Sequence, residues 1–355
     1  MLAIQTPHYP ILFNNDCYSF LQETITPDKY SKVFVVADSN TSQLCLPNFL
    51  AQLATEVEIE ILEIDAGEIN KTIETCTQLW YALTEMGGDR KSIMINVGGG
   101  MITDLGGFVS STFKRGIDFI NVPTSLLSMV DASVGGKTGV DLGSLKNQVG
   151  VISNPIAVLM DINYLGTLPQ NEMRAGLAEM LKHGLICDKT YWEKFLDLNE
   201  LTTDDLQQLI YESIIIKNNV VTQDPTEKGL RKILNFGHTL GHAIESYHLD
   251  TEEKTTLLHG EAIAIGMVLE SYISFKKDLL TLNEYTQIKE VITSIFGKTE
   301  FDQTDIENIM KLLSHDKKSE FGEVLFVVLN GIGKASFNEP VNNELITEAF
   351  HDYLA

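Results

Sequence analysis

The chain has 355 residues, of which 44% are hydrophobic and 21% are charged. This length exceeds the usual size of a domain with a single hydrophobic core, so we expect two domains. Its formal net charge of −23 repels nucleic acid and anionic membranes at long range and excludes both as natural partners. No apolar run approaches the roughly 20 residues of a membrane span, and the N-terminal segment lacks the basic head and apolar core of a signal peptide, so a cytoplasmic protein is expected.

In the first half of the chain, short apolar runs alternate with helical patterns. The runs at residues 33–37, 57–64, 92–97, 118–122 and 156–160 predict strands, and the first is expected to end in a turn over residues 38–40. Helices are predicted over residues 44–54, 71–86 and 125–130, and around Asp104. Repeated strand–helix units indicate an α/β fold with a doubly wound, mostly parallel sheet.

After Pro169 the pattern changes to long helices. They are predicted over residues 172–186, 206–221, 235–247 and 260–275, with one or two late strands around residues 323–329. We therefore expect an α/β domain over residues 1–169 and a mainly α-helical domain over residues 170–355.

Two glycine-rich segments are candidates for phosphate binding. Gly98, Gly99 and Gly100 stand where a strand should pass into a helix, so backbone N–H groups could hold a phosphate there, although a tight structural turn is an equal alternative. Residues 136–138 (GKT) look like the end of a P-loop, but Asp131 occupies the position of its first glycine. This spacing excludes the ATPase interpretation.

Several cations lie near these motifs and near the histidines further along the chain. Most would be solvated surface charges in an ordinary protein, but together they indicate a pocket for a small anion. They are Lys137, Lys146, Lys182, Lys217, Arg231, Lys317 and Lys318.

Residues 235–245 (NFGHTLGHAIE) place His238 and His242 four residues apart, on one face of a helix. The zinc-protease motif needs Glu directly after the first His, and Thr239 stands there, so a metal must recruit further ligands elsewhere. A helix with one packed and one solvated His is the alternative.

Two His and one carboxylate are a frequent zinc-ligand set. His238 and His259 each adjoin a glycine, which fits residues presented at helix starts. Glu179 lies in an otherwise apolar helix face and needs a cation, either a metal or Lys182. A partly exposed Glu179–Lys182 surface pair remains the alternative.

Five segments together resemble the 3-dehydroquinate synthase family. They are residues 98–104 (GGGMITD), 122–138 (VPTSLLSMVDASVGGKT), 176–183 (GLAEMLKH), 234–242 (LNFGHTLGH) and 259–261 (HGE), and the match runs in order from about Val33 to Gly333. The resemblance implies an N-terminal NAD-binding domain and a C-terminal α-helical domain that binds metal and substrate. Leu145 and Asn171 depart from the usual family pattern, at positions to which the family's chemistry is not usually assigned.

The resemblance also implies roles for individual residues. Zinc, or another divalent ion such as cobalt, would be held by Glu179, His238 and His259. Phosphate would be held by Asn147, Lys182, Asn235, His242 and Lys317, with Arg115 reaching in from the partner subunit of a homodimer. The substrate's hydroxyls and carboxylate would contact Asp131, Lys137, Lys217 and Arg231. NAD would be bound by Asp38, Glu68, Lys71, Gly99, Gly100, Asp104, Thr124, Ser125, Asp131, Lys137, Lys146 and Thr167.

The implied reaction converts 3-deoxy-D-arabino-heptulosonate 7-phosphate to 3-dehydroquinate and phosphate, a shikimate-pathway step catalysed by a phosphorus–oxygen lyase. Its oxidation by NAD is transient, because NADH returns the hydride. The alternatives are another sugar-phosphate cyclase, such as 2-deoxy-scyllo-inosose or 2-epi-5-epi-valiolone synthase, and an NAD- and metal-dependent polyol dehydrogenase. A catalytically dead binding protein is a further alternative, and the presence of every expected zinc and phosphate residue argues against it.

Overall fold

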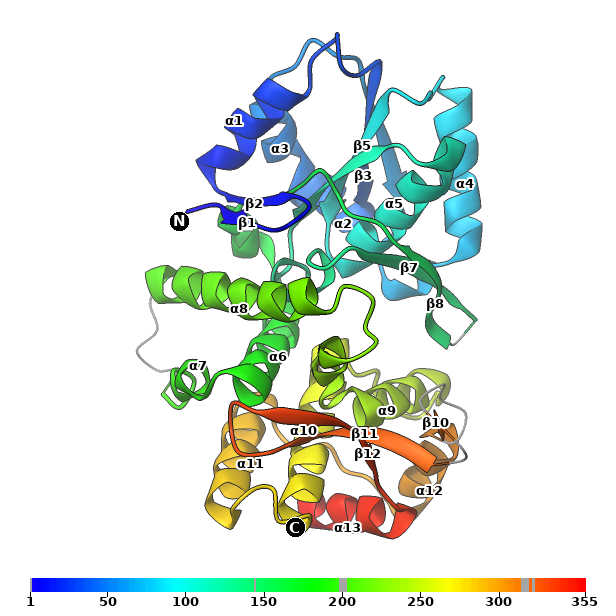
Figure 1. Cartoon of the computed structure of the whole chain (residues 1–355). Coiled ribbons are helices and arrows are strands. Elements are labelled where there is room, and N and C mark those ends of the chain that lie inside the picture. The colour runs from blue at the N-terminus through cyan, green and yellow to red at the C-terminus, as the bar shows by residue number, and fades with distance from the viewer. Residues whose placement is uncertain (1, 144, 198–202, 314–318, 321–322) are drawn as a thin grey trace. The chain divides into compact units, whose positions relative to one another are not determined.

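The computed structural model describes residues 2–355 except 144, 198–202, 314–318 and 321–322. The chain divides into two compact units, Met1–Met173 and Arg174–Ala355 (Figure 1). Among the described residues, no helix combines the length and apolar character needed to cross a membrane.

The first unit is built on a seven-stranded sheet in the order β1-β2-β9-β6-β5-β3-β4. All neighbouring pairs are parallel except β1 with β2. The strands are β1 (Ile4–Gln5), β2 (Pro10–Phe13), β3 (Lys32–Asp38), β4 (Ile59–Ile64), β5 (Ser92–Gly98), β6 (Asp118–Pro123) and β9 (Ala157–Met160). The helices are α1 (Asn15–Thr24), α2 (Ser39–Leu44), α3 (Leu46–Gln52), α4 (Ile73–Glu85) and α5 (Gly100–Thr112), with the short 3-10 helices η1 (Glu68–Asn70), η2 (Phe113–Arg115) and η4 (Ile162–Thr167) and the π-helix η3 (Ser128–Ala132).

Both faces of this sheet are covered, because its central strands are apolar at successive positions. Val33 and Val35 of β3 pack into one core cluster with α1 and α3, while Phe34 and Val36 pack into another with α4 and α5. Figure 1 shows these two pairs of helices on opposite sides of the sheet. The predicted α/β, doubly wound fold is confirmed.

The structure corrects the predicted elements after β3. Residues 38–40 form no separate turn, because the Asp38 carboxylate accepts hydrogen bonds from Asn40 N and Thr41 N, both at 2.9 Å, and caps a helix that begins at Ser39. Of the predicted helix over residues 44–54, residues 46–52 form α3, with Pro47 in its first turn, while α2 ends where the predicted helix begins. The hairpin of β7 (Lys137–Leu142) and β8 (Leu145–Ile152) was not predicted.

The helix α6 (Gln170–Cys187) leads into the second unit, which is mainly helical. Its other elements are α7 (Lys189–Glu193), α8 (Thr203–Gln223), η5 (Leu230–Asn235), α9 (His238–Asp250), α10 (His259–Lys276), α11 (Leu282–Phe296), α12 (Gln303–Leu313), α13 (Asn343–Leu354), β10 (Ser319–Glu320), β11 (Glu323–Leu329) and β12 (Ala335–Pro340). The strands form an antiparallel sheet in the order β10-β11-β12. The central helix is α10, which is buried along most of its length and packs against α9, α11, α13 and β11.

The predicted helix over residues 235–247 begins three residues late, at His238. Gly237 has a φ of +78°, a left-handed conformation that separates the helical turns of η5 from those of α9. The histidine that follows this glycine is therefore the first residue of α9.

Candidate active site

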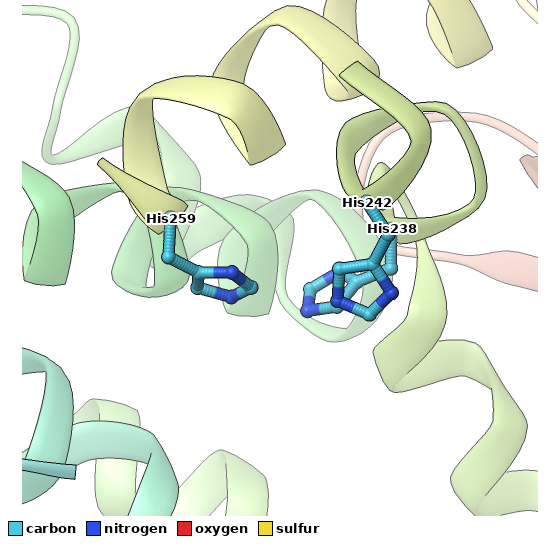
Figure 2. Close-up of side chains that lie close together, drawn as sticks. All are labelled: His238, His242 and His259. Atoms are coloured by element: carbon cyan, nitrogen blue, oxygen red, sulfur yellow. The ribbon is translucent and has the colours of Figure 1, made fainter. Parts of the chain in front are cut away.

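Three histidines of the second unit gather at the beginnings of two helices. His238 opens α9, His242 lies one turn further along it, and His259 opens α10. Their ring centroids are 5.1 Å (His238 to His242), 5.5 Å (His238 to His259) and 5.6 Å (His242 to His259) apart. One nitrogen of each ring lies within 4.8 Å of the others, and Figure 2 shows the rings facing a common space. The prediction that His238 and His259 stand at helix starts is confirmed.

Hydrogen bonds fix which nitrogen of two of these rings carries the proton. His238 Nδ1 lies 3.1 Å from the Phe236 carbonyl oxygen, and His259 Nδ1 lies 3.1 Å from Glu245 Oε2. A carbonyl or carboxylate oxygen can only accept, so each Nδ1 donates and the Nε2 lone pair of each neutral ring stays available to a cation. This is the usual arrangement of a histidine prepared for a metal.

Glu179 adds a buried carboxylate beside the histidines. Its side chain is 0% exposed, and its Oε1 lies 3.6 Å from His238 Nε2. Lys182, one turn later on α6 and 1% exposed, forms an ion pair with Glu179 Oε2. The alternative of a partly exposed surface pair is therefore wrong.

The Glu179 carboxylate is suited to a further cation. Despite the ion pair with Lys182, neither of its oxygens accepts a hydrogen bond of ordinary geometry. Burying a carboxylate in this state is costly unless a cation compensates it. A carboxylate and imidazole nitrogens are also a normal ligand set for zinc and similar divalent ions, so these residues fit a metal.

Cationic side chains that the sequence suggested for an anion pocket are also buried in the second unit. Lys182, Lys217 on α8 and Arg231 on η5 are all buried, which excludes the solvated-surface alternative for these three. Arg231 Nη1 donates to the Pro225 carbonyl at 2.8 Å, and Asn235 Nδ2 donates to Glu227 Oε1 at 2.8 Å. Lys317 and Lys318 lie outside the described residues.

In the first unit, the predicted NAD residues meet at the carboxyl ends of parallel strands. Asp38 ends β3, the glycines at 98–100 join β5 to α5, and Thr124 follows β6, with its N–H donating to the Gly98 carbonyl at 3.0 Å. The α5 N-terminus has no side-chain cap, so its N–H groups remain available to a ligand. This edge of a doubly wound sheet is where such folds bind nucleotides.

Further predicted residues of the first unit form one polar cluster around Lys71. The buried Lys71 Nζ donates to Asp104 Oδ2 at 2.6 Å and to Asn147 Oδ1 at 2.8 Å. Burial lowers the pKa of Lys71, but the facing carboxylates of Asp104 and Glu68 outweigh this and raise its pKa above the usual value, so the ammonium stays charged. Lys146 pairs with Glu68 at 3.2 Å in the same cluster.

The remaining predicted residues of the first unit take separate positions. Asp131 lies in η3 and Lys137 begins β7, while Thr167 Oγ1 donates to the Tyr164 carbonyl at 2.8 Å. Ser125 follows Thr124, and its Oγ accepts a hydrogen bond from Ser128 N at 3.2 Å. Arg115 ends η2 with an exposed side chain.

Two family models match consecutive parts of the chain. The model for the 3-dehydroquinate synthase N-terminal domain matches residues 61–175, and that for the 3-dehydroquinate synthase C-terminal domain matches residues 176–319. A 3-dehydroquinate synthase of Parabacteroides distasonis is 39% identical over 345 residues, 97% of each chain. The chain belongs to the 3-dehydroquinate synthase family. The predicted family and its enzyme class, a phosphorus–oxygen lyase, are confirmed.

Other members and more distant structures extend the comparison. A 3-dehydroquinate synthase of Helicobacter pylori is 38% identical over 322 residues, 91% of this chain and 92% of the relative. A structure of 2-deoxy-scyllo-inosose synthase with carbaglucose-6-phosphate, NAD⁺ and Co²⁺ is 26% identical with a TM-score of 0.83, over 99% of both chains. A 2-epi-5-epi-valiolone synthase from Streptomyces hygroscopicus, with NAD⁺ and Zn²⁺ bound, is 26% identical with a TM-score of 0.85, over 100% of this chain and 99% of that one.

Two residues that contact these candidate site residues were not predicted from the sequence. Glu245 orients His259, and a signal existed, because Glu245 lies seven residues after His238 and thus on the same helix face. Asp141 accepts a hydrogen bond from Asn147 N at 2.7 Å and lies 3.4 Å from Lys146 Nζ. Nothing local marks Asp141, because its partners belong to the other strand of an unpredicted hairpin.

Proposed function

We propose that this 3-dehydroquinate synthase converts 3-deoxy-D-arabino-heptulosonate 7-phosphate to 3-dehydroquinate and phosphate in the cytoplasm, with NAD and a divalent metal. The observation that carries the proposal is the buried Glu179 carboxylate beside His238, His242 and His259, in a unit that also buries Lys217 and Arg231. A metal site beside Lys182, in a unit that buries two further cationic side chains, suits a substrate that carries both phosphate and carboxylate.

Glu179, His238 and His259 would hold the metal, which is zinc or another divalent ion such as cobalt. When bound, the metal supplies Lewis-acid polarisation of a substrate hydroxyl. Glu245 holds the His259 ring with Nε2 available as a ligand, and the Phe236 carbonyl does the same for His238. The protein thereby fixes both ring orientations before any ligand arrives.

The dinucleotide would lie along the ends of β3, β5 and β6, contacted by the residues that the family resemblance assigns to it. NAD supplies a hydride acceptor that is regenerated within one turnover, so no net NADH forms. The uncapped N-terminus of α5 would hold its pyrophosphate. Asp38 at the end of β3 would contact the adenosine part.

Cationic and amide side chains would bind the substrate's anionic groups. Lys182, Asn235 and His242 would hold the phosphate, with Asn147 and Lys317, and stabilise its charge as it leaves. Arg231 and Lys217, together with Asp131 and Lys137, would orient the carboxylate and hydroxyls. His242, one turn from His238, would share proton handling with the phosphate group.

The chain would act as a homodimer in which Arg115 reaches the partner's phosphate site. In support, the Arg115 side chain is exposed, and its backbone has a φ of +74° next to Lys114 at +49°. Non-glycine residues adopt such angles at a cost of about 1–3 kcal/mol each, and proteins retain them mostly at functional positions.

The decisive experiment incubates the purified protein with the heptulosonate phosphate and NAD, before and after chelation. Phosphate release without net NADH, abolished by the chelator and restored by zinc, is the expected result. Accumulation of NADH would instead indicate a polyol dehydrogenase. Turnover of an uncarboxylated sugar phosphate, with none of the heptulosonate phosphate, would indicate another cyclase.

A further inference from the structure

Glu270 lies in the middle of α10, the most buried helix of the second unit, and its side chain is 0% exposed. Its carboxylate leaves its own helix and contacts the start of α9. Oε2 accepts a hydrogen bond from Gly237 N at 2.6 Å, and Oε1 accepts one from Leu240 N at 3.2 Å. These two N–H groups flank His238.

This contact replaces a cap that α9 lacks. The N-cap residue of α9 is Gly237, which has no side chain to bond the first N–H groups of the helix. A carboxylate at a helix N-terminus satisfies those N–H groups and interacts favourably with the helix dipole. Glu270 supplies both effects from a neighbouring helix.

The helices α9 and α10 approach each other closely around this contact. A Cβ on Gly266 would lie 2.0 Å from the Gly237 carbonyl oxygen, so α10 can approach this turn only with a glycine at that position. Further along the seam, Gly241 faces Ile263 and Glu245 bonds His259, so α9 runs antiparallel to α10. The helix α10 thus begins with His259 and, about three turns later, carries Glu270, which bonds the backbone on both sides of His238.

We propose that Glu270 is a positioning residue for the metal site, one that sets the place and orientation of His238 through the start of α9 before the metal binds. This inference rests on the proposed metal role of His238 and His259. It extends that role to a residue that touches neither the metal nor the substrate.

The test compares Glu270→Gln with Ser274→Ala. An amide has a single acceptor oxygen and cannot bond both Gly237 N and Leu240 N. Ser274 is a matched control, because it lies one turn further along α10, is equally buried, and accepts a hydrogen bond from Leu329 N at 3.0 Å, away from α9. Ser274→Ala loses this bond and also the one that Ser274 Oγ donates to the Glu270 carbonyl oxygen at 2.7 Å, whereas only Glu270→Gln loses a hydrogen bond at the start of α9.

The readout is zinc affinity of the folded proteins, measured by competition with a chromophoric chelator. We expect Glu270→Gln to bind zinc about 10- to 100-fold more weakly than the unaltered chain, with kcat recovering at saturating zinc, and Ser274→Ala to keep the original affinity. Equal affinity of the unaltered chain and Glu270→Gln, or an equal loss in Ser274→Ala, would overturn the proposal. If the unaltered chain binds no zinc, or if His238→Ala binds zinc as tightly as the unaltered chain, the proposed metal site itself fails.

Hydrogen exchange of the unaltered, metal-free protein gives a second test that does not depend on the variant folding. The amides of Gly237 and Leu240 should be protected from exchange without metal, and addition of zinc should change their protection little. Protection that appears only with zinc would mean that the metal orders this turn, contrary to the proposal.

Discussion

At the scale of single residues, the Glu179–Lys182 pair bears directly on the proposed metal site. Removing two charges from water costs several kcal/mol for each ion, and one ion pair seldom recovers this cost in full. Glu179 also has no ordinary hydrogen bond to its oxygens. The ion pair alone therefore stabilises the fold poorly, as expected if the Glu179 carboxylate also binds a metal cation.

Replacing Glu179 by Gln should accordingly affect both binding and stability. We expect loss of zinc binding, and a decrease of about 3–5 kcal/mol in the free energy of unfolding of the metal-free protein, because Lys182 is left buried without its partner. Urea denaturation measures the second effect. The control is Glu212→Gln, which breaks the partly exposed pair with Lys194 and should cost no more than about 1 kcal/mol. Similar losses in both variants would show that burial of the first pair has no energetic role.

Single residues were predictable from the sequence where their own neighbours reveal them. His238 and His259 adjoin glycines and do begin helices, and the apolar neighbours of Glu179 already indicated a buried carboxylate. Glu270 gave no comparable signal. Its partners are 30 and 33 residues away in sequence, and their approach depends on the packing of two helices.

At the scale of elements, α9 and the segment that follows it are both bonded to α12. Asp305, buried on α12, accepts hydrogen bonds from Lys254 Nζ and Tyr247 Oη, both at 2.6 Å. The tied segment ends at His259, the first residue of α10. Asp305 thus holds the segment that precedes this histidine at Lys254.

This tie should make stability depend on pH in the acid range. Burial raises the pKa of Asp305, but hydrogen bonds from Lys254, Tyr247 and the Asp302 backbone outweigh it and hold the pKa below its usual value. The stabilisation is therefore complete above the unfolded pKa of about 3.9 and is lost as pH falls through the lower folded value.

Asp305→Asn should have a lower free energy of unfolding than the unaltered chain at neutral pH. As pH falls through the acid range, urea denaturation should show that this free energy decreases less in Asp305→Asn than in the unaltered chain. Glu307→Gln, at an exposed position of the same helix, serves as the control and should follow the unaltered chain. An unchanged pH slope in Asp305→Asn would refute the assignment.

Elements with a strong local period were predicted well, and those defined by distant contacts were not. The buried strands β3, β5 and β6 lie close to their predicted positions, because continuous apolar runs bounded by polar residues identify them. The hairpin of β7 and β8 has a glycine-rich sequence with little alternation, and it is fixed partly by Lys71, which lies far earlier in the chain and bonds Asn147. Such a contact cannot be inferred from the hairpin's own residues.

At the scale of the whole molecule, the proposed homodimer makes a specific prediction about mixed subunits. Arg115→Ala would disable the partner's site, and His259→Ala would disable its own. A dimer with one subunit of each kind has one complete site, formed by the intact His259 of one subunit and the intact Arg115 of the other. Random mixing should therefore restore about one quarter of the original activity from two inactive variants. No recovery, with subunit exchange verified by mass, would place Arg115 in the site of its own chain.

The β4 edge of the large sheet affects how the protein behaves in concentrated solution. Among the described strands, β4 ends the sheet and pairs only with β3, so one row of its backbone groups has no partner strand. Such edges invite other chains to add on, and charged side chains are a common defence. Glu60 and Glu63 lie along β4, in a chain of net charge −23. Acidification towards the isoelectric point removes that repulsion, so this edge is where self-association in acid should begin.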